Sequence, residues 1–164
     1  MANEKIITRK EQQVAEVTEK MRAASSTIVV DYLGLTVEQV TKLRRELREA
    51  GVEMHVYKNN LTRRAADAMD VPELRDSLTG PNAVLFATTD DATAAARIAY
   101  NFAKTNDKLE LKAGIMEGAY VSQEQVKELA ALPGREGMYS MLLSVLQAPI
   151  RNLAYVTSQI AEGK

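Results

Sequence analysis

The sequence predicts an α+β fold: a mixed sheet covered by helices as a two-layer sandwich, followed by a long protruding C-terminal helix. Short β-branched runs alternate with amphipathic helical patterns along residues 1–131. The 164 residues are 46% hydrophobic and 26% charged, which is enough for one globular core. A Pro-Gly break then precedes an apolar helical pattern. We therefore expect a domain over 1–131, a hinge at 132–134 and a helix over 135–164.

The first elements alternate between helix and strand. Apolar residues at helical spacing between charged ones predict a helix over 8–24. Residues 25–32 are short and β-branched, which favours a buried strand. Thr36 and Gln39 have the spacing of a capping box, which predicts a helix over 36–50 that Gly51 ends. The apolar face expected for this helix consists of Val37, Val40, Leu43 and Leu47.

A strand and a further helix follow. Residues 52–58 alternate apolar and polar side chains, which is typical of a strand with one face in water. We expect Asn59 to begin a helix that continues to Met69, where Val71-Pro72 breaks the pattern. The side chains expected on the wet face of the strand are Glu53, His55 and Tyr57.

Two more strand and helix pairs complete the domain. Residues 80–88 predict a turn and an apolar strand, and residues 90–104 predict an alanine-rich helix. Residues 109–117 alternate as a strand. Ser122 and Gln125 again have capping-box spacing, which predicts a short helix that ends at Ala131.

Few residues are suited to catalysis. His55 is the only histidine, and we interpret it as an exposed strand residue rather than a general base. One histidine and no cysteine leave a zinc site without its usual ligands. Asp90-Asp91 could bind a divalent cation, but we interpret the pair as the cap of a helix. Gly80-Pro81-Asn82 leads into a strand and is a structural turn, not a phosphate loop. We expect no enzyme, no metal and no cofactor.

Basic residues gather between Thr36 and Ala66, although the formal net charge of the whole chain is −1. Arg44 and Arg48 lie one helical turn apart and repel each other, so an external anion would stabilise them. Lys58-Asn59-Asn60 opens a helix where a lysine, two amides and free N–H groups could hold a phosphate. Arg63 and Arg64 follow one turn later. Ordinary solvated charges with an asparagine cap remain an alternative interpretation.

The C-terminal stretch 138–160 has too wide an apolar face for a surface helix of a monomer. A narrow polar line contains Ser144, Gln147 and Arg151. We expect partner polypeptides to cover the rest, although a helix folded back on its own domain is the alternative. The predicted partner-binding residues are Met138, Tyr139, Leu142, Leu143, Val145, Leu146, Ile150, Leu153, Val156 and Ile160.

Pro149 lies inside this helical pattern. Proline has no N–H and clashes with the preceding turn, so it should kink the helix or split it into docking segments near 138–148 and 149–161. The polar residues make this stretch a poor membrane span. The N-terminus has no apolar signal core, so we expect a cytoplasmic protein.

Several motifs in series resemble one family, the bacterial stalk-base protein known as large-subunit ribosomal protein ten. The resemblance covers nearly the whole chain. The motifs are DYLGLT (31–36), LRRELREAGVE (43–53), VYKNNLTRRA (56–65), LTGPNAV (78–84), LKAGIMEG (111–118) and LPGREGMYSMLLSVLQAPIRNLA (132–154).

The resemblance implies a structural protein of the large ribosomal subunit. Its N-terminal domain would bind the GTPase-associated region of the large-subunit ribosomal RNA, beside large-subunit protein eleven. Its C-terminal helix would carry dimers of the acidic stalk protein, which recruit translational GTPases, and two segments suit two dimers. The RNA-facing residues implied by position are Tyr32, Gly34, Leu35, Thr36, Lys58, Asn59, Asn60 and Arg63.

Two positions depart from the family pattern. Leu33 stands where many members have a basic residue, so this loop should contact RNA less through charge. Asn60 stands where threonine is frequent, which keeps a polar helix start. A non-ribosomal α/β interaction adaptor would explain the terminal helix equally well, but it leaves the basic residues without a role. A nucleotide-using enzyme is a third alternative, but the sequence shows neither the phosphate loop nor the general base that such an enzyme needs.

Overall fold

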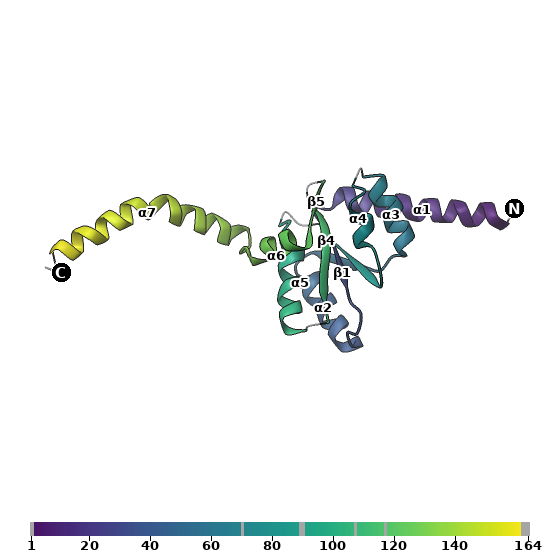
Figure 1. Ribbon diagram of the computed structural model, residues 1–164, viewed down its shortest axis with the longest axis horizontal. Coiled ribbons are helices and arrows are strands. Elements are labelled where there is room, and N and C mark those ends of the chain that lie inside the picture. The colour runs from purple at the N-terminus through teal and green to yellow at the C-terminus, as the bar shows by residue number, and fades with distance from the viewer. Residues whose placement is uncertain (1, 70, 89–90, 107, 117, 162–164) are drawn as a thin grey trace. The chain divides into compact units, whose positions relative to one another are not determined.

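The computed structural model describes residues 2–69, 71–88, 91–106, 108–116 and 118–161. They form seven helices and five strands in the described part of the chain (Figure 1). In chain order these elements are α1 (Ala2–Ala23), β1 (Ser26–Asp31), α2 (Val37–Glu49), β2 (Val52–His55), α3 (Asn59–Asp67), α4 (Leu74–Ser77), β3 (Asn82–Ala87), α5 (Ala94–Thr105), β4 (Glu110–Met116), β5 (Ala119–Val121), α6 (Gln123–Ala131) and α7 (Arg135–Ala161).

The chain divides into two compact units, residues 1–132 and 133–164. The first unit contains one five-stranded sheet with the order β2-β3-β1-β4-β5, and every strand pair in it is antiparallel. At the C-terminal end of β1, Asp31 pairs with Asn82 of β3 on one side and with Glu110 of β4 on the other. The ends of three strands therefore meet at Asp31.

Helices lie on both faces of the sheet. In β1, Ile28 and Val30 pack with core residues of α2, α5 and α6, whereas Val29 points to the opposite face. That second face is covered by α3 and α4, and by α1 through Val17 and Met21. Figure 1 shows α5 and α6 on one side of the strands and α3 and α4 on the other.

The α+β class, the helix-covered sheet and the long C-terminal helix are confirmed. Two details differ from the expectation: the sheet is antiparallel rather than mixed, and it lies between two helical layers rather than under one. Helix α2 connects β1 to β2, which lies two places away from β1 in the sheet. The antiparallel strand β3 lies between them. The connection from β3 through α5 to β4 does the same around β1. Alternating strands and helices therefore build interlocked split β-α-β units without parallel neighbours.

Local signals set the helix ends as expected. Both capping boxes are present, at Thr36 with Gln39 and at Ser122 with Gln125. Gly51 follows α2 with φ of 73°, a conformation that glycine adopts at little cost.

Three expected positions differ from the structure. Val37 is 85% exposed, because the first turn of α2 extends past the sheet before Leu43 and Leu47 reach the core. The strand expected over 52–58 ends at His55, and Val56 is exposed. The helix expected from 90 begins at Ala94.

Asp91 partly fulfils the expected capping role before α5. Its Oδ1 accepts hydrogen bonds from the Thr93 N–H and Oγ1 at 3.1 and 2.7 Å, and its Oδ2 pairs with Arg97 Nη2 at 3.0 Å. Burial raises the pKa of Asp91, but the bonds from Thr93 and Arg97 outweigh burial and leave that pKa below its usual value. Asp90, the other half of the expected cap, lies outside the described residues.

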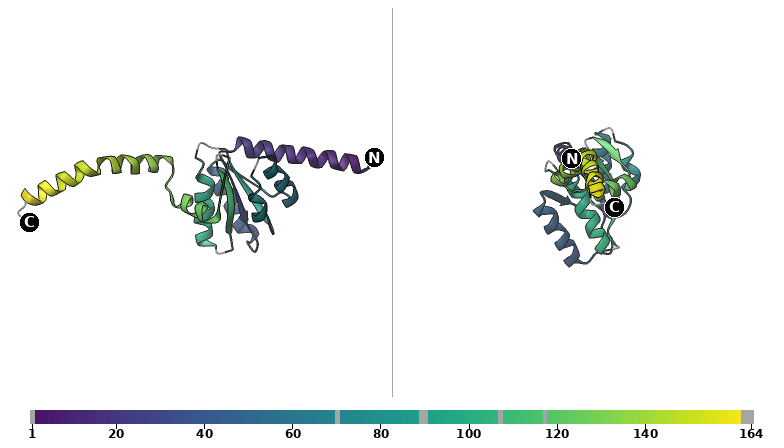
Figure 2. Two further views of the ribbon diagram at one scale, coloured as in Figure 1. Left: turned by 45° about the horizontal axis from the view of Figure 1, so that its top comes forward. Right: turned by 90° about the vertical axis from the view of Figure 1, so that its left-hand side faces the viewer.

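The second unit contains α7, a single α-helix that includes Pro149. The ribbon in Figure 2 is a continuous coil that bends along its length. The helix is not split at Pro149, which lies inside it. None of the described α7 residues is buried. Among the described residues, no helix has both the length and the apolarity to cross a membrane.

Candidate functional sites

Two of the predicted loops leave the sheet at the end of the strands marked by Asp31. Because Asp31 pairs with Asn82 and His55 pairs with Val84, β1 and β2 both finish where β3 begins. The loop after β1, residues 32–36, and the turn into α3 therefore leave the sheet at the same edge.

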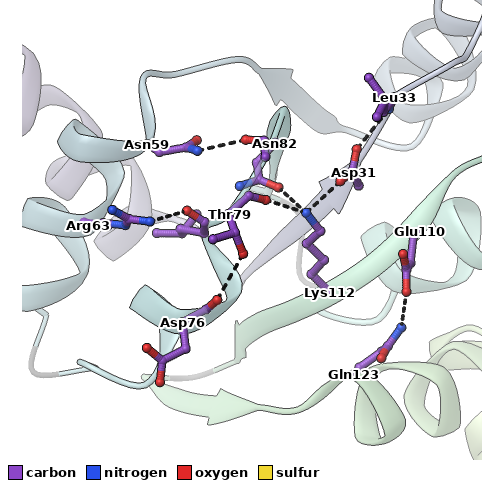
Figure 3. A network of polar contacts seen from close by, with 12 residues as sticks. Asp31, Leu33, Asn59, Arg63, Asp76, Thr79, Asn82, Glu110, Lys112 and Gln123 are labelled. Atoms are coloured by element: carbon purple, nitrogen blue, oxygen red, sulfur yellow. Dashed lines mark hydrogen bonds and ion pairs between the residues drawn. The ribbon is translucent and has the colours of Figure 1, made fainter.

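A network centred on Lys112 holds this edge together (Figure 3). Lys112 Nζ lies 2.7 Å from Asp31 Oδ2 and donates to Thr79 O at 2.6 Å and Asn82 Oδ1 at 2.9 Å. Asp31 Oδ1 also accepts the Leu33 N–H at 3.0 Å. One half-buried ammonium thus connects β4, the end of β1 and the turn before β3.

The same turn also anchors α3. Asn59 Nδ2 donates to Gly80 O at 2.8 Å, and Arg63 Nη2 donates to Leu78 O at 2.7 Å (Figure 3). Two groups that we expected to face a phosphate are therefore engaged with the chain itself. These bonds orient the start of α3.

Three other groups at the start of α3 face solvent. Lys58 is the N-cap residue of α3, is exposed and makes no side-chain capping bond. Asn60 and Arg64 are also exposed, and with Arg63 and the ion pair between Arg75 and Asp67 they line a cleft of about 600 Å³. Amide, ammonium and guanidinium donors are suited to phosphate oxygens.

Part of the loop of residues 32–36 is engaged with the rest of the chain. Tyr32 and Leu35 are partly buried against the core, and the Thr36 hydroxyl accepts the Gln39 N–H. Leu33, which we did not select, is 67% exposed.

Gly34 lies beneath a lysine that sequence analysis missed. Its φ is 83°, and a Cβ built there would lie 3.2 Å from Lys108 Cδ. The Lys108 stem therefore crosses this loop, so the exposed Lys108 side chain adds a positive charge to the edge. No local pattern links the two residues, which are far apart in the sequence and meet only through the β1–β4 pairing.

Arg44 and Arg48 lie on the outer side of α2 and do not line the α3 cleft. They line a second cleft of about 420 Å³ along β2, together with Lys20 of α1 and His55. Two ion pairs form beside them on α2, Lys42 with Glu38 and Arg45 with Glu49, each at 3.0 Å. The predicted basic residues therefore form two groups rather than one.

The wet face expected for β2 is half covered. His55 stacks on Tyr57 with ring centroids 5.6 Å apart, and both rings contact Phe86 beneath α1. The imidazole Nε2 lies 3.1 Å from Glu53 Oε2, and this bond, helped by Lys20, lowers the pKa of Glu53 despite some burial. Burial also raises the pKa of Tyr57. His55 is thus a partly exposed strand residue whose ring packs on Tyr57 and Phe86.

Helix α7 carries the predicted apolar surface. Apart from Met138, which is half-buried, every predicted partner-binding residue is 52% to 73% exposed. Met141 and Tyr155, which we did not select, are equally exposed and widen the surface. The Arg135 guanidinium lies over the Tyr139 ring and donates to its hydroxyl at 3.1 Å.

Comparison with known proteins identifies one family across both units. A family model described as Ribosomal protein L10 matches residues 5–104, and one described as Ribosomal protein uL10 C-terminal region matches residues 132–164. Curated relatives named Large ribosomal subunit protein uL10 occur in Bacillus cereus (strain B4264) and Bacillus anthracis (strain A0248). Each is 56% identical over 160 residues, which cover 98% of this chain and 96% of the relative.

Proposed function

The chain belongs to the ribosomal protein L10 family, and from this premise we propose that it forms the base of the ribosomal stalk. Members of this family are structural proteins of the large ribosomal subunit and not enzymes, so the chain is a component of the cytoplasmic ribosome. In the proposed arrangement, residues 1–131 bind ribosomal RNA, residues 132–134 act as a hinge, and residues 135–164 carry partner proteins.

The RNA-binding half of the proposal rests on the sheet edge and the α3 cleft. Lys58, Asn60 and Arg64 present exposed donors there, and Lys112 holds the neighbouring turn through Thr79 and Asn82. Asn59 and Arg63 position α3 through Gly80 and Leu78. Phosphate contacts of this kind fix the orientation of a protein on RNA. The remaining proposed RNA-facing residues are Tyr32, Gly34, Leu35, Thr36, Arg44 and Arg48.

The protein-binding half rests on one observation, the exposed apolar surface of α7. Burying a leucine or isoleucine side chain contributes roughly 1.5–3 kcal/mol, so leaving this surface in water favours association. A partner that offers an apolar groove would take α7 in the helix-in-groove mode. Of the charged residues in α7, Arg135 and Arg151 outnumber Glu136, which complements an acidic partner.

Pro149 divides this surface into two parts of similar length. Before it lie Tyr139, Leu143 and Leu146, and after it lie Ile150 and Leu153. We assign each part to one dimer of the acidic stalk protein, which gives two dimers per chain. Large-subunit protein eleven would neighbour the RNA-bound domain, and translational GTPases would be recruited through the dimers.

Native mass spectrometry of the complex purified from cells tests the proposal. The wild-type chain should carry two dimers. Leu143→Asp or Leu146→Asp places a carboxylate in the buried groove and should abolish loading of the dimer before Pro149. Gln147→Glu, which adds the same charge on the polar line of the same turn, is the matched control and should load normally. Equal loading of Leu143→Asp and wild type would contradict the assignment of α7.

A further inference from the structure

The cleft along β2 lies between two helices at the open edge of the sheet. β2 is the outermost strand, with β3 on its only paired side. Lys20 enters this cleft from α1, which covers one face of the sheet, and Arg44 and Arg48 enter from α2, which covers the other face. Three cationic side chains from two separate elements thus converge on about 420 Å³ of open space.

The two arginines have no acidic partner of their own. Among the residues that the structure describes, neither the Arg44 nor the Arg48 side chain forms an ion pair or a hydrogen bond. Lys42 and Arg45 on the same helix are both paired, so the difference lies in position and not in residue type. Two like charges one turn apart destabilise a helix slightly, and a bound anion removes that cost.

The one carboxylate that lines the cleft is already engaged. Glu53 Oε2 lies 3.1 Å from His55 Nε2 and 3.7 Å from Lys20 Nζ. The stack of His55 on Tyr57 holds the imidazole in place. Lys20 also has Glu16 at 3.9 Å, so its charge is shared, whereas the guanidinium groups are available in full.

This cleft is distant from the end of the sheet near Asp31, where the loop of residues 32–36 begins. α2 begins at the capping residue Thr36, and Arg48 follows it by twelve positions, which corresponds to about 18 Å along the helix axis. The α3 cleft and the β2 cleft share no lining residue. One phosphate group therefore cannot contact both sites.

We infer that the β2 cleft is a second phosphate-binding site, which holds a separate stretch of RNA backbone between Lys20, Arg44 and Arg48. The inference rests on the proposed RNA-binding function and adds to it a second contact and Lys20 as an unassigned ligand. Arginine forks match phosphate oxygens in a bidentate manner, which favours a phosphodiester over a single carboxylate. Two separate contacts would fix the orientation of the domain on a folded RNA.

The experiment measures binding of the full-length chain to a transcript of the GTPase-associated region of ribosomal RNA over a series of salt concentrations. Arg48→Ala and Lys20→Ala should each weaken binding several-fold and lower the salt slope by about one unit. Arg45→Ala is the matched control, because it removes an exposed arginine from the same helix that is already paired with Glu49. Its binding should equal that of wild type.

A double variant that changes both clefts distinguishes one RNA-binding site from two. Because the sites are far apart, the fold-losses of Arg48→Ala and Lys58→Ala should multiply in the double variant. If wild type binds the RNA and the affinities of Arg48→Ala and Lys20→Ala equal that of Arg45→Ala, the second site alone is overturned. An acidic peptide that binds wild type but not Arg48→Ala, with RNA binding unchanged, would also overturn it in favour of a protein ligand. Absence of any wild-type RNA binding would instead reject the RNA half of the proposed function.

Discussion

Strand β1 and helix α7 are both rich in apolar residues, but the chain covers only one of them. Every residue of β1 except Asp31 is buried, between helices on the two faces of the sheet. In the described part of α7 no residue is buried, although its apolar surface extends from Tyr139 to Ile160. An apolar pattern therefore states that a side chain needs cover, and only the remainder of the molecule shows whether the chain supplies it.

The two regions should consequently obtain their stability from different sources. The first unit is held by its own core and by the polar contacts of Lys112. Isolated helices gain little from propensity alone, and in proteins most helical stability comes from packing of an apolar face. The stability of α7 should therefore depend on burial of its apolar face against the proposed partner.

The largest expected effect contrasts two leucine-to-alanine changes. Leu43 is fully buried in the core, and Leu43→Ala should lower the free energy of unfolding of the first unit by about 2–5 kcal/mol. Leu146 is 66% exposed, and Leu146→Ala should change it by less than about 0.5 kcal/mol. Urea denaturation of the purified chain, followed by circular dichroism, measures both. Equal destabilisation by the two variants would mean that α7 is part of the same cooperative core.

A smaller effect tests the polar side of the comparison. Lys112→Met removes the ammonium from Asp31, Thr79 O and Asn82, so that the half-buried carboxylate of Asp31 and the buried amide of Asn82 each lose a partner. The free energy of unfolding should fall by about 1–3 kcal/mol. Lys127→Met, an exposed change on α6, is the control and should lie near wild type. A Lys112→Met chain as stable as the control would show that the network contributes orientation without stability.

The features that could be predicted from the sequence are those encoded within a few residues. The capping boxes at Thr36 and Ser122 were predicted because their hydrogen-bonding partners lie three positions away. The buried strand β1 followed from its β-branched composition, and the breadth of the apolar face of α7 indicated its exposure.

Features that depend on distant segments were missed or wrong. Sheet order depends on which antiparallel strand fills each gap, and no local period encodes that choice. The contact of Lys108 with Gly34 and the bonds that engage Asn59 and Arg63 join residues brought together only by the sheet. Arg44 and Arg48 were recognised as unusual, but their separation from the α3 cleft required the structure.

The smallest expected effect separates the two regions by pH. The pKa of Asp91 is lowered in the folded chain, so its contribution to stability is present above the unfolded value of about 3.9 and is lost as the pH falls through the folded pKa. Asp91→Asn removes the ion pair with Arg97 and should cost about 1 kcal/mol at neutral pH. Urea midpoints measured between neutral pH and about pH 2 should show the difference from wild type shrinking below about pH 4.

The same titration should leave α7 almost unaffected, because Glu136 is the only carboxyl group between Arg135 and Ala161. The two regions thus differ in what acid should remove. In the sheet domain it removes the charge of paired carboxylates, whereas in α7 it should remove little, because the proposed source of stability there is apolar burial. A gap between Asp91→Asn and wild type that stays constant down to about pH 2 would show that the ion pair with Arg97 is not the source of the effect. Loss of the hydrogen bonds from Thr93 would not explain the gap either, because asparagine can still accept them. The cause would then be altered packing at the start of α5.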